Sequence, residues 1–313
     1  MKETVKRPVI LDTDPGVDDA VAMLLLLGSE QVDLQAITVV GGNVGLKSTL
    51  RNALCLTELA GRTDVPVYAG AASPLMVRLV TAPDVHGAGG LGSLSLPDPV
   101  TKPAAGEVSE LFYRRALERP GELTIIAIGP LTNVAKAFLA HPDLPGLLRE
   151  VIVMGGGILG GNATLQAEFN IYVDPEAARI VFESGVKLTM VPLDVCNQTT
   201  LGSGEIEQVE AVGTACADAV ASLLRYSHAI STRMGLKGCP VYDAVTAAYL
   251  LRPDLFSCGD FVVAIETRGV KTRGKTVVDW YGVSRRAANC TIPLSCNAAG
   301  YLSLLLDRLS RLP

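Results

Sequence analysis

Four aspartates lie within eight residues of one another near the start of the chain: Asp12, Asp14, Asp18 and Asp19. The apolar run at 9–11 is typical of a buried parallel strand, and strand alternation sends Asp12 and Asp14 to the same side. The Pro-Gly pair at 15–16 ends this strand. A helical pattern then begins at Asp18 and continues to the stop at Gly28. Asp18 and Asp19 are therefore expected at a helix N-terminus that faces the end of the strand.

Four acids at one corner of a fold are costly, because like charges raise one another's pKa and burial adds to the cost. A bound cation is the simplest compensation. Oxygen ligands without a nearby His or Cys favour Ca²⁺ or Mg²⁺ over Zn²⁺. The alternative is that Asp18 only caps its helix and that residues 12–14 lie in a solvated loop.

The composition excludes several classes of function. The net charge is -5 without a basic block, which argues against a nucleic acid as partner. No stretch has the pattern of a signal peptide, and no apolar run reaches the roughly 18 residues of a membrane span, so we expect no membrane partner and a cytoplasmic location. The seven cysteines form no C-x-x-C pair, so neither a disulfide framework nor a zinc site is indicated.

Strand-like and helix-like segments alternate along much of the chain. Strands are expected at 9–11, 34–40, 67–69, 123–128, 150–154, 187–191, 261–266 and 276–279, and helices at 18–27, 47–59, 107–117, to 140 after the turn at 129–133, 175–183, 205–234, 242–251 and 298–309. This order predicts an α/β fold with a mostly parallel, Rossmann-like open central sheet flanked by helices. With no linker and no internal repeat, we expect one large domain over 1–313. The segment 71–103 is long and rich in Gly and Pro, so it is expected to be a functional loop.

Polar residues follow most of the predicted strands, and in an open parallel sheet ligands collect at the carboxyl ends of the strands. The candidates at these ends are Asp12, Asp14, Asn43, the turn 129–133, Asn162, Glu168, Asn170, Asp194 and Asn197. Acids and amides dominate this set, with hardly a cation among them. Such a lining favours a metal ion and a neutral ligand with many hydroxyls, and it does not suit a phosphate group.

The motifs as a set resemble those of the inosine-uridine-preferring nucleoside hydrolases, which cleave ribonucleosides to ribose and free base. The resemblance covers nearly the whole chain and rests on DTDPGVDDA from Asp12, GGNVGLKSTLRNAL from Gly41, PVYAGA from Pro66, VHGAGGLG from Val85, IGPLTNVA from Ile128, VMGGG from Val153, GNATLQAEFNIYVDPEAARIVF from Gly161, LDVCNQ from Leu193 and VYDAV from Val241. Each motif alone is weak evidence, but their joint presence in this order is highly specific. The resemblance implies hydrolysis of the N-glycosidic bond and a homodimer or homotetramer.

The resemblance also implies a role for individual residues. The positions that match the family's single Ca²⁺ site are Asp14, Asp19, Asp243 and the main-chain carbonyl of Ile128, and Asp14 matches the general base that activates the Ca²⁺-bound water. The positions that match contacts to the ribose are Asp18 and Asn43 near the 2'-hydroxyl, Asn170 and Asp243 near the 2'- and 3'-hydroxyls, Asn162 and Glu168 at the 5'-hydroxyl, and Met154 against the sugar. These residue types suit N-glycosidic bond cleavage, because carboxylate and amide oxygens stabilise an oxocarbenium-like ribosyl cation.

The departure from the family pattern lies at the leaving group. Many members carry His just before the last metal-binding Asp, and this chain has Tyr242. A phenol is a poor acid at neutral pH, so Tyr242 is expected to stack on or bond the base. His86 aligns with a histidine that some members place near the base, and it could replace the missing acid or be structural. Tyr226 and His228 could close over the base, although packing or exposure is the favoured use.

Three other interpretations deserve comparison. The pair Asp12-x-Asp14 is shared with haloacid-dehalogenase-type phosphotransferases, but Gly16 stands where that class has Thr or Val. The letters Gly155-x-Gly157-x-x-Gly160 fit a dinucleotide fingerprint, but no amphipathic helix opens there. The third interpretation is a nucleoside or ribose binder that kept the metal site and lost turnover, which the substitution at Tyr242 makes a real alternative. Base preference is not readable, because the segments 71–103 and 225–238 would contact the base.

Overall fold

The computed structural model describes residues 6–313, so the first five positions of the expected domain lie outside the described residues. One eight-stranded sheet has the order β3-β2-β1-β4-β5-β6-β10-β7. Its strands are β1 (Arg7–Thr13), β2 (Val32–Val39), β3 (Val67–Ala69), β4 (Thr124–Ala127), β5 (Glu150–Met154), β6 (Leu188–Val191), β7 (Phe256–Phe261) and β10 (Cys290–Cys296). Neighbouring strands are parallel except for the pair β10 and β7. The predicted α/β fold with a mostly parallel sheet is confirmed.

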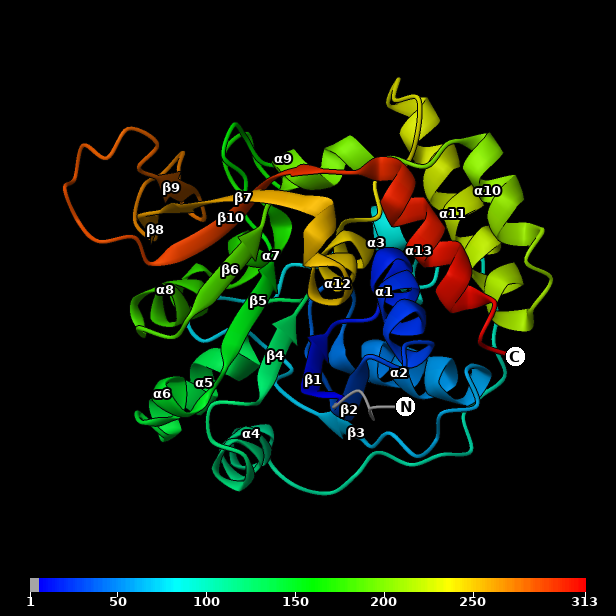
Figure 1. Cartoon of the computed structure of the whole chain (residues 1–313), viewed down its shortest axis with the longest axis horizontal. Coiled ribbons are helices and arrows are strands. Elements are labelled where there is room, and N and C mark those ends of the chain that lie inside the picture. The colour runs from blue at the N-terminus through cyan, green and yellow to red at the C-terminus, as the bar shows by residue number, and fades with distance from the viewer. Residues whose placement is uncertain (1–5) are drawn as a thin grey trace.

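Helices cover both faces of the sheet (Figure 1). One hydrophobic cluster joins the sheet to α1 (Val17–Leu27), α2 (Leu46–Leu59), α9 (Leu193–Cys196), α10 (Ser203–Glu210), α11 (Ala215–Arg233), α12 (Tyr242–Leu251) and α13 (Ala298–Leu309). A second cluster, on the other face, involves α4 (Val108–Glu118), α5 (Thr132–Ala140), α6 (Leu144–Leu147), α7 (Phe169–Val173) and α8 (Pro175–Glu183). A four-residue helix, α3 (Pro83–His86), lies within the long segment 71–103.

The central strand β1 shows why its sequence is continuously apolar. Val9 and Leu11 belong to the first cluster, whereas Ile10 between them belongs to the second. Because successive side chains of a strand point to opposite faces, a strand covered on both faces needs apolar residues at every position. The carboxyl end of this buried strand carries the opening aspartates into the interior of the protein.

One prediction for the C-terminal third is wrong. The single helix expected at 205–234 is two helices, α10 and α11, because Gly213 adopts a φ of 76° and the Thr214 hydroxyl accepts the N–H of Ala217 to begin α11. The strands expected at 261–266 and 276–279 are present with shorter bounds. Phe261 ends β7, and β8 (Val263–Ile265) pairs with β9 (Thr276–Val278) in a separate antiparallel hairpin. Strand β10 lies in the main sheet and was not predicted.

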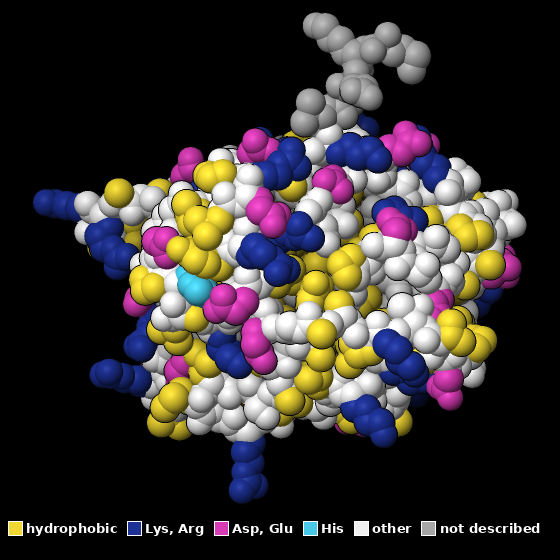
Figure 2. Space-filling model, turned by 90° about the horizontal axis from the view of Figure 1, so that it is seen from below, with side chains coloured by type: hydrophobic (Ala, Val, Ile, Leu, Met, Phe, Trp, Pro, Cys, Tyr) yellow, Lys and Arg dark blue, Asp and Glu magenta, His cyan; other side chains and the backbone are white. Residues whose placement is uncertain are grey.

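The surface carries charges of both signs. On the face seen in Figure 2, acidic and basic side chains alternate and neither sign forms a continuous patch. Among the described residues, no helix has the combination of length and apolar character that a membrane crossing requires.

Candidate active site

The turn between β1 and α1 holds the opening aspartates in the protein interior. Asp12, Asp14 and Asp19 have no exposed surface, and the Asp18 side chain is only 16% exposed. Gly16 permits the close approach of neighbouring groups here, since a Cβ at this position would come within 2.5 Å of His86 Nδ1. This burial contradicts the alternative in which residues 12–14 lie in a solvated loop.

Asn43, at the end of β2, fixes two of these aspartates. Its main-chain N–H donates to Asp14 Oδ2 at 2.6 Å, and its side-chain amide donates to Asp19 Oδ2 at 2.8 Å. Asp19 Oδ1 also accepts the Thr13 hydroxyl at 2.6 Å, and Oδ2 accepts the Gly16 N–H at 3.0 Å. Neutral donors therefore orient both carboxylates without removing their negative charge.

The structure brings a carboxylate from far along the chain to the same corner. Asp243, in the first turn of α12, is 3% exposed, and oxygens of Asp18, Asp19 and Asp243 lie within 4.8 Å of one another. Asp14 is outside this group of three. Its Oδ1 is nevertheless buried and, within residues 6–313, has no hydrogen-bond partner. An orphaned carboxylate oxygen beside three further carboxylates is an arrangement that a bound cation would satisfy.

The pKa shifts of these aspartates also indicate a site that needs positive charge. Burial, and next the charge of Asp19, raises the pKa of Asp14 well above its usual range. Burial, and next the charge of Asp18, does the same to the pKa of Asp243. Burial raises the pKa of Asp18 itself to about 6. The aspartates thus resist ionisation together unless positive charge enters the site.

A second group of polar side chains comes from the segment between β5 and α7 and from the start of α7. Glu168 precedes α7 and accepts three main-chain N–H groups, from Gly156 at 3.1 Å, Asn170 at 2.9 Å and Ile171 at 3.1 Å. Its burial raises the pKa of Glu168 to about 7. The three hydrogen bonds therefore fix the Glu168 carboxylate at the wall of the site. With a pKa of about 7, the group is partly protonated at neutral pH.

Two asparagines complete this wall. The side-chain amide of Asn170 donates to the main-chain oxygens of Ile128 at 2.9 Å and Met154 at 3.2 Å, so its Oδ1 stays available as an acceptor. Asn162 Oδ1 accepts the main-chain N–H of Phe169 at 2.9 Å, which leaves its amide group as a donor. The wall therefore offers both kinds of partner to a hydroxyl group.

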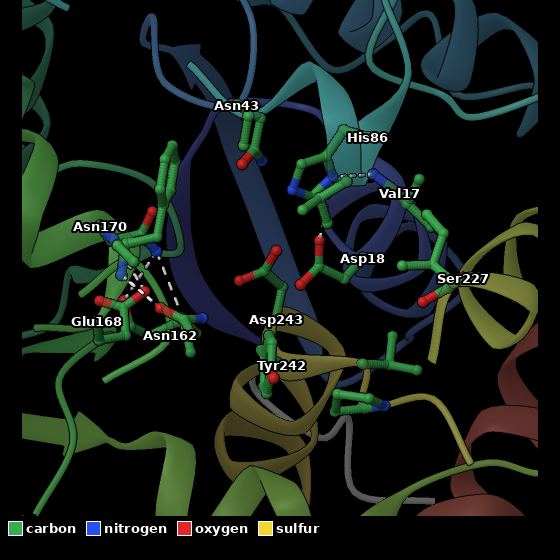
Figure 3. A pocket seen from close by; sticks show the side chains of 18 of the residues that line it. Val17, Asp18, Asn43, His86, Asn162, Glu168, Asn170, Ser227, Tyr242 and Asp243 are labelled. Atoms are coloured by element: carbon green, nitrogen blue, oxygen red, sulfur yellow. Dashed lines mark hydrogen bonds and ion pairs between the residues drawn. The ribbon is translucent and has the colours of Figure 1, made fainter. Parts of the chain in front are cut away.

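His86 ends the short helix α3 and faces the same space. Its Nδ1 accepts the main-chain N–H of Val17 at 3.1 Å and lies 3.9 Å from Asp18 Oδ1. Burial lowers the pKa of His86, so the ring is neutral at pH 7. A neutral imidazole that accepts at Nδ1 must carry its proton on Nε2, and this nitrogen turns toward the open centre of the pocket (Figure 3).

These residues line one cavity of about 390 Å³. Asp18 and Asp243 lie near its centre, with Glu168, Asn162 and Asn170 on one side and Ser227 on the other (Figure 3). Much of the remaining lining is apolar: Val80, Ala82 and Val85 from 71–103, and Leu224, Ile230, Met234 and Leu236 from α11 and the residues after it. Among the described residues that line the cavity there is no lysine or arginine.

Asn43, Ile128, Met154 and Tyr242 also line the cavity, whereas Asp14 and Asp19 lie directly behind its wall. Several other candidates lie elsewhere. Asp12 Oδ1 accepts from Thr38 at 2.5 Å and Asn133 at 2.7 Å, away from the cavity, and Asp194 accepts main-chain N–H groups of residues 158 and 159. Asn197, Tyr226 and His228 do not line the cavity either.

Ser227 and Ser231 are cavity residues that the sequence interpretation did not single out. They are four residues apart on α11 and therefore share one face of the helix. Their spacing with Ile230 is the only signal in the sequence, and it is also typical of ordinary core packing. The polar wall followed from the ends of the strands, but this opposite wall depends on where a distant helix packs.

The fold and the cavity together define a sugar-binding hydrolase of the α/β class, and the comparisons with known proteins identify the family. The family described as "Inosine-uridine preferring nucleoside hydrolase" matches residues 9–303. The chain belongs to this family. It is an N-ribosyl hydrolase, an enzyme that cleaves the N-glycosidic bond of ribonucleosides. The match gives no support to a haloacid-dehalogenase-type phosphotransferase.

Individual relatives agree in sequence and in structure. The chain is 42% identical over 306 residues to the pyrimidine-specific ribonucleoside hydrolase RihA of Enterobacter sp. (strain 638), with 97% of this chain and 98% of that protein covered. It is 41% identical over 304 residues to RihA of Escherichia coli (strain SMS-3-5 / SECEC), with 96% and 98% covered. Among solved structures, a plant nucleoside hydrolase, PpNRh1, matches with a TM-score of 0.90 at 30% identity, covering 97% of this chain and 99% of that one. A purine-preferring ribonucleoside hydrolase from Gardnerella vaginalis matches with a TM-score of 0.91 at 29% identity, covering 97% and 98%.

Proposed function

We propose that this enzyme hydrolyses pyrimidine ribonucleosides to ribose and free base with the help of a Ca²⁺ ion. The ion would be held by Asp14, Asp19, Asp243 and the main-chain carbonyl of Ile128. The observation that carries the proposal is the buried, unpartnered Oδ1 of Asp14 beside a group of carboxylates with no basic neighbour in the cavity. All these donors are hard oxygens, which favour Ca²⁺ and provide no soft ligand for Zn²⁺. When bound, the ion would offset the clustered negative charge and polarise a water molecule.

The chain's own residues divide the remaining work. Asp14 Oδ1 has no other hydrogen bond to satisfy, so it can accept the proton of the attacking water, while Oδ2 stays fixed by the Asn43 N–H. Asn43 acts by holding this base and by facing the sugar. The carboxylates and amide oxygens around the cavity stabilise the positive charge that develops on the ribosyl group as the glycosidic bond breaks.

The ribose is oriented by acceptors and donors on the polar wall. Asp18 and Asp243 lie at the centre of the cavity, where they can accept from the 2'- and 3'-hydroxyls together with the free Oδ1 of Asn170. Glu168 and Asn162 offer an acceptor and a donor to the 5'-hydroxyl, and Met154 packs against the sugar. Each of these contacts fixes the anomeric carbon relative to Asp14.

The departing base would contact His86 and Tyr242. Nε2–H of His86 is a hydrogen-bond donor aimed into the cavity, and it can stabilise negative charge on a leaving base without transferring its proton completely. Tyr242 is a weaker candidate for this role, since burial raises the pKa of its phenol and the group holds its proton at neutral pH. We therefore assign leaving-group assistance to His86 and packing against the substrate to Tyr242.

The preference for pyrimidines is supported by two observations. The relatives at 42% and 41% identity are named as pyrimidine-specific hydrolases, whereas the purine-preferring relative is 29% identical. In addition, Tyr242 replaces the histidine that many family members carry at this position, so a strong proton donor is missing on that side of the cavity. We therefore expect the preferred substrates to be pyrimidine nucleosides, whose base would leave with a hydrogen bond from His86 and no further proton donor.

A panel of ribonucleosides tests the proposal. We expect ribose release from uridine and cytidine to exceed that from inosine and adenosine, and to stop when a chelator is added and return with CaCl₂. Isothermal titration with the same nucleosides separates turnover from binding. Heat of binding without ribose release would instead favour a nucleoside-binding protein, and activity that is indifferent to chelator would exclude the metal site. Light scattering tests the homodimer or homotetramer that we also propose.

A further inference from the structure

Asn52, on α2, joins two segments of the active site although it does not line the cavity. The residue is 2% exposed. Its side-chain amide donates to the main-chain oxygen of Pro15 at 3.0 Å and to that of Gly89 at 2.8 Å. Pro15 follows the general base directly, and Gly89 lies three residues after His86. One amide group therefore bridges the metal-binding turn and the loop that carries the leaving-group donor.

The loop 87–92 is anchored by one buried apolar side chain, Leu91, and has few hydrogen bonds to the rest of the fold. Gly87, Gly90 and Gly92 all adopt positive φ angles, which only glycine reaches without strain. The other hydrogen bonds of this loop are local: the N–H groups of Gly87, Gly90 and Gly92 donate to the carbonyls of Pro83, Gly87 and His86, and the Leu91 carbonyl accepts from Leu94. Within residues 6–313, Asn52 donates the one hydrogen bond that ties 87–92 to a different part of the fold. Without it, the Gly89 end of the loop would lose its polar tie to the β1–α1 turn.

The position of His86 depends on the same pair of segments. His86 packs over Gly16 and accepts the N–H of Val17, so its orientation is correct only when its loop keeps its distance from the turn 15–17. The ring of Tyr226, on α11, covers the other side of the loop, because a Cβ at Gly92 would come within 2.6 Å of it. Asn52 and Tyr226 thus hold the loop from two sides.

We propose that Asn52 is a positioning residue for leaving-group departure: by bridging Pro15 and Gly89 it keeps Nε2–H of His86 aimed at the departing base. This inference rests on the proposed function, and in particular on the role of His86. The residue type fits, because both acceptors are carbonyl oxygens and an uncharged NH₂ group offers two donors from one atom. A carboxylate of the same shape would face two carbonyls and make neither bond.

Two substrates distinguish positioning from a general structural role. Uridine has a leaving group that needs assistance, whereas 4-nitrophenyl ribofuranoside releases a stable phenolate and needs almost none. We expect Asn52→Ala to lower kcat for uridine by about 10- to 100-fold, as a displaced catalytic group does, and to change kcat for the nitrophenyl substrate by less than about threefold. Asn52→Asp should behave in the same way. In a His86→Ala background, Asn52→Ala should cause little further loss on uridine.

Thr57→Ala is a matched control, because Thr57 is also buried on α2 and its hydroxyl bonds only within the helix. Thr57→Ala should leave kcat unchanged for both substrates. Equal losses on both substrates with Asn52→Ala, or a full additional loss in the His86→Ala background, would overturn the inference. If the wild-type enzyme cleaved neither substrate, the proposed function would fail instead, so the two failures are distinguishable.

Nuclear magnetic resonance gives a readout that does not depend on turnover. The chain has three histidines, so the imidazole nitrogens of His86 can be assigned with single-site variants. We expect wild-type His86 to show a single tautomer with the proton on Nε2, and Asn52→Ala to shift its signals toward a mixture of tautomers. Unchanged His86 signals would overturn the inference. If Asn52→Ala does not fold, Asn52→Ser removes the same bridge with a smaller change in polarity.

Discussion

The clustered aspartates predict how the stability of the metal-free protein depends on pH. Burial raises the pKa of Asp18 from 3.8 to about 6, so the carboxylate binds its proton more tightly in the folded chain than in the unfolded one. Folding stability should therefore fall as the pH rises from about 4 to 6 and stay lower above that. At about 1.4 kcal/mol per pKa unit, the ionised Asp18 alone costs about 3 kcal/mol.

This cost translates into a measurable change in melting temperature. With about 2.1 cal/mol/K of unfolding entropy per residue and 313 residues, 3 kcal/mol corresponds to about 5 °C. Bound Ca²⁺ should offset it, because a ligand at 100 times its Kd stabilises the folded state by about 2.7 kcal/mol. The gap in Tm between CaCl₂ and chelator should consequently be small near pH 4.5 and reach several degrees at pH 7.

Differential scanning fluorimetry from pH 4.5 to 7.5, with chelator or with CaCl₂, measures this gap directly. Asp18→Asn should flatten the pH dependence in chelator, since it removes one of the ionising groups. Asp98→Asn is the matched control, because that carboxylate is 89% exposed and pairs with Arg51 on the protein surface. A gap that is absent at pH 7, or that has the same size at every pH, would refute the reasoning.

Four further outcomes are expected. Asp14→Asn should lower kcat for uridine by about 100- to 10,000-fold, with the fold retained by circular dichroism, because it removes the proton acceptor; a loss below tenfold would exclude Asp14 as the base. 2'-Deoxyuridine should react at least about 100-fold more slowly than uridine in kcat/KM, since acceptors such as Asp18 would lose their partner, and comparable rates would contradict that contact. His86→Ala should reduce kcat for uridine far more than for 4-nitrophenyl ribofuranoside, and equal losses would argue against leaving-group assistance. Tyr242→His should raise the rate for inosine relative to uridine by about tenfold, and an unchanged ratio would mean that this position does not control the base.

The sequence was most informative where a local pattern determines the structure. The β1 strand and the first helix were predicted because a continuous apolar run and a helical repeat are separated by Pro15 and Gly16. Strand β10 was not, because it contains Pro293 and Ser295 and is recognisable only from its position beside β6. The break between α10 and α11 depends on one glycine, Gly213, within an otherwise helical pattern.

The candidate site divides in the same way. Residues at strand ends were predictable, because the carboxyl ends of parallel strands meet at one edge of the sheet. The partner of His86, by contrast, is the main-chain N–H of Val17, and the bridge made by Asn52 joins residues that are 37 positions away in each direction. Such contacts depend on how distant segments pack, and no local pattern encodes them.

The cavity lining also has a consequence for phosphorylated ligands. A nucleoside 5'-monophosphate would bring its dianion against the Glu168 carboxylate, and no basic side chain lines the described cavity to compensate. If Glu168 contacts the 5'-hydroxyl as proposed, we expect nucleotides to be poor substrates and dephosphorylated nucleosides to be the form that is cleaved. The acidic wall proposed to stabilise a ribosyl cation would in this way also exclude phosphorylated ligands.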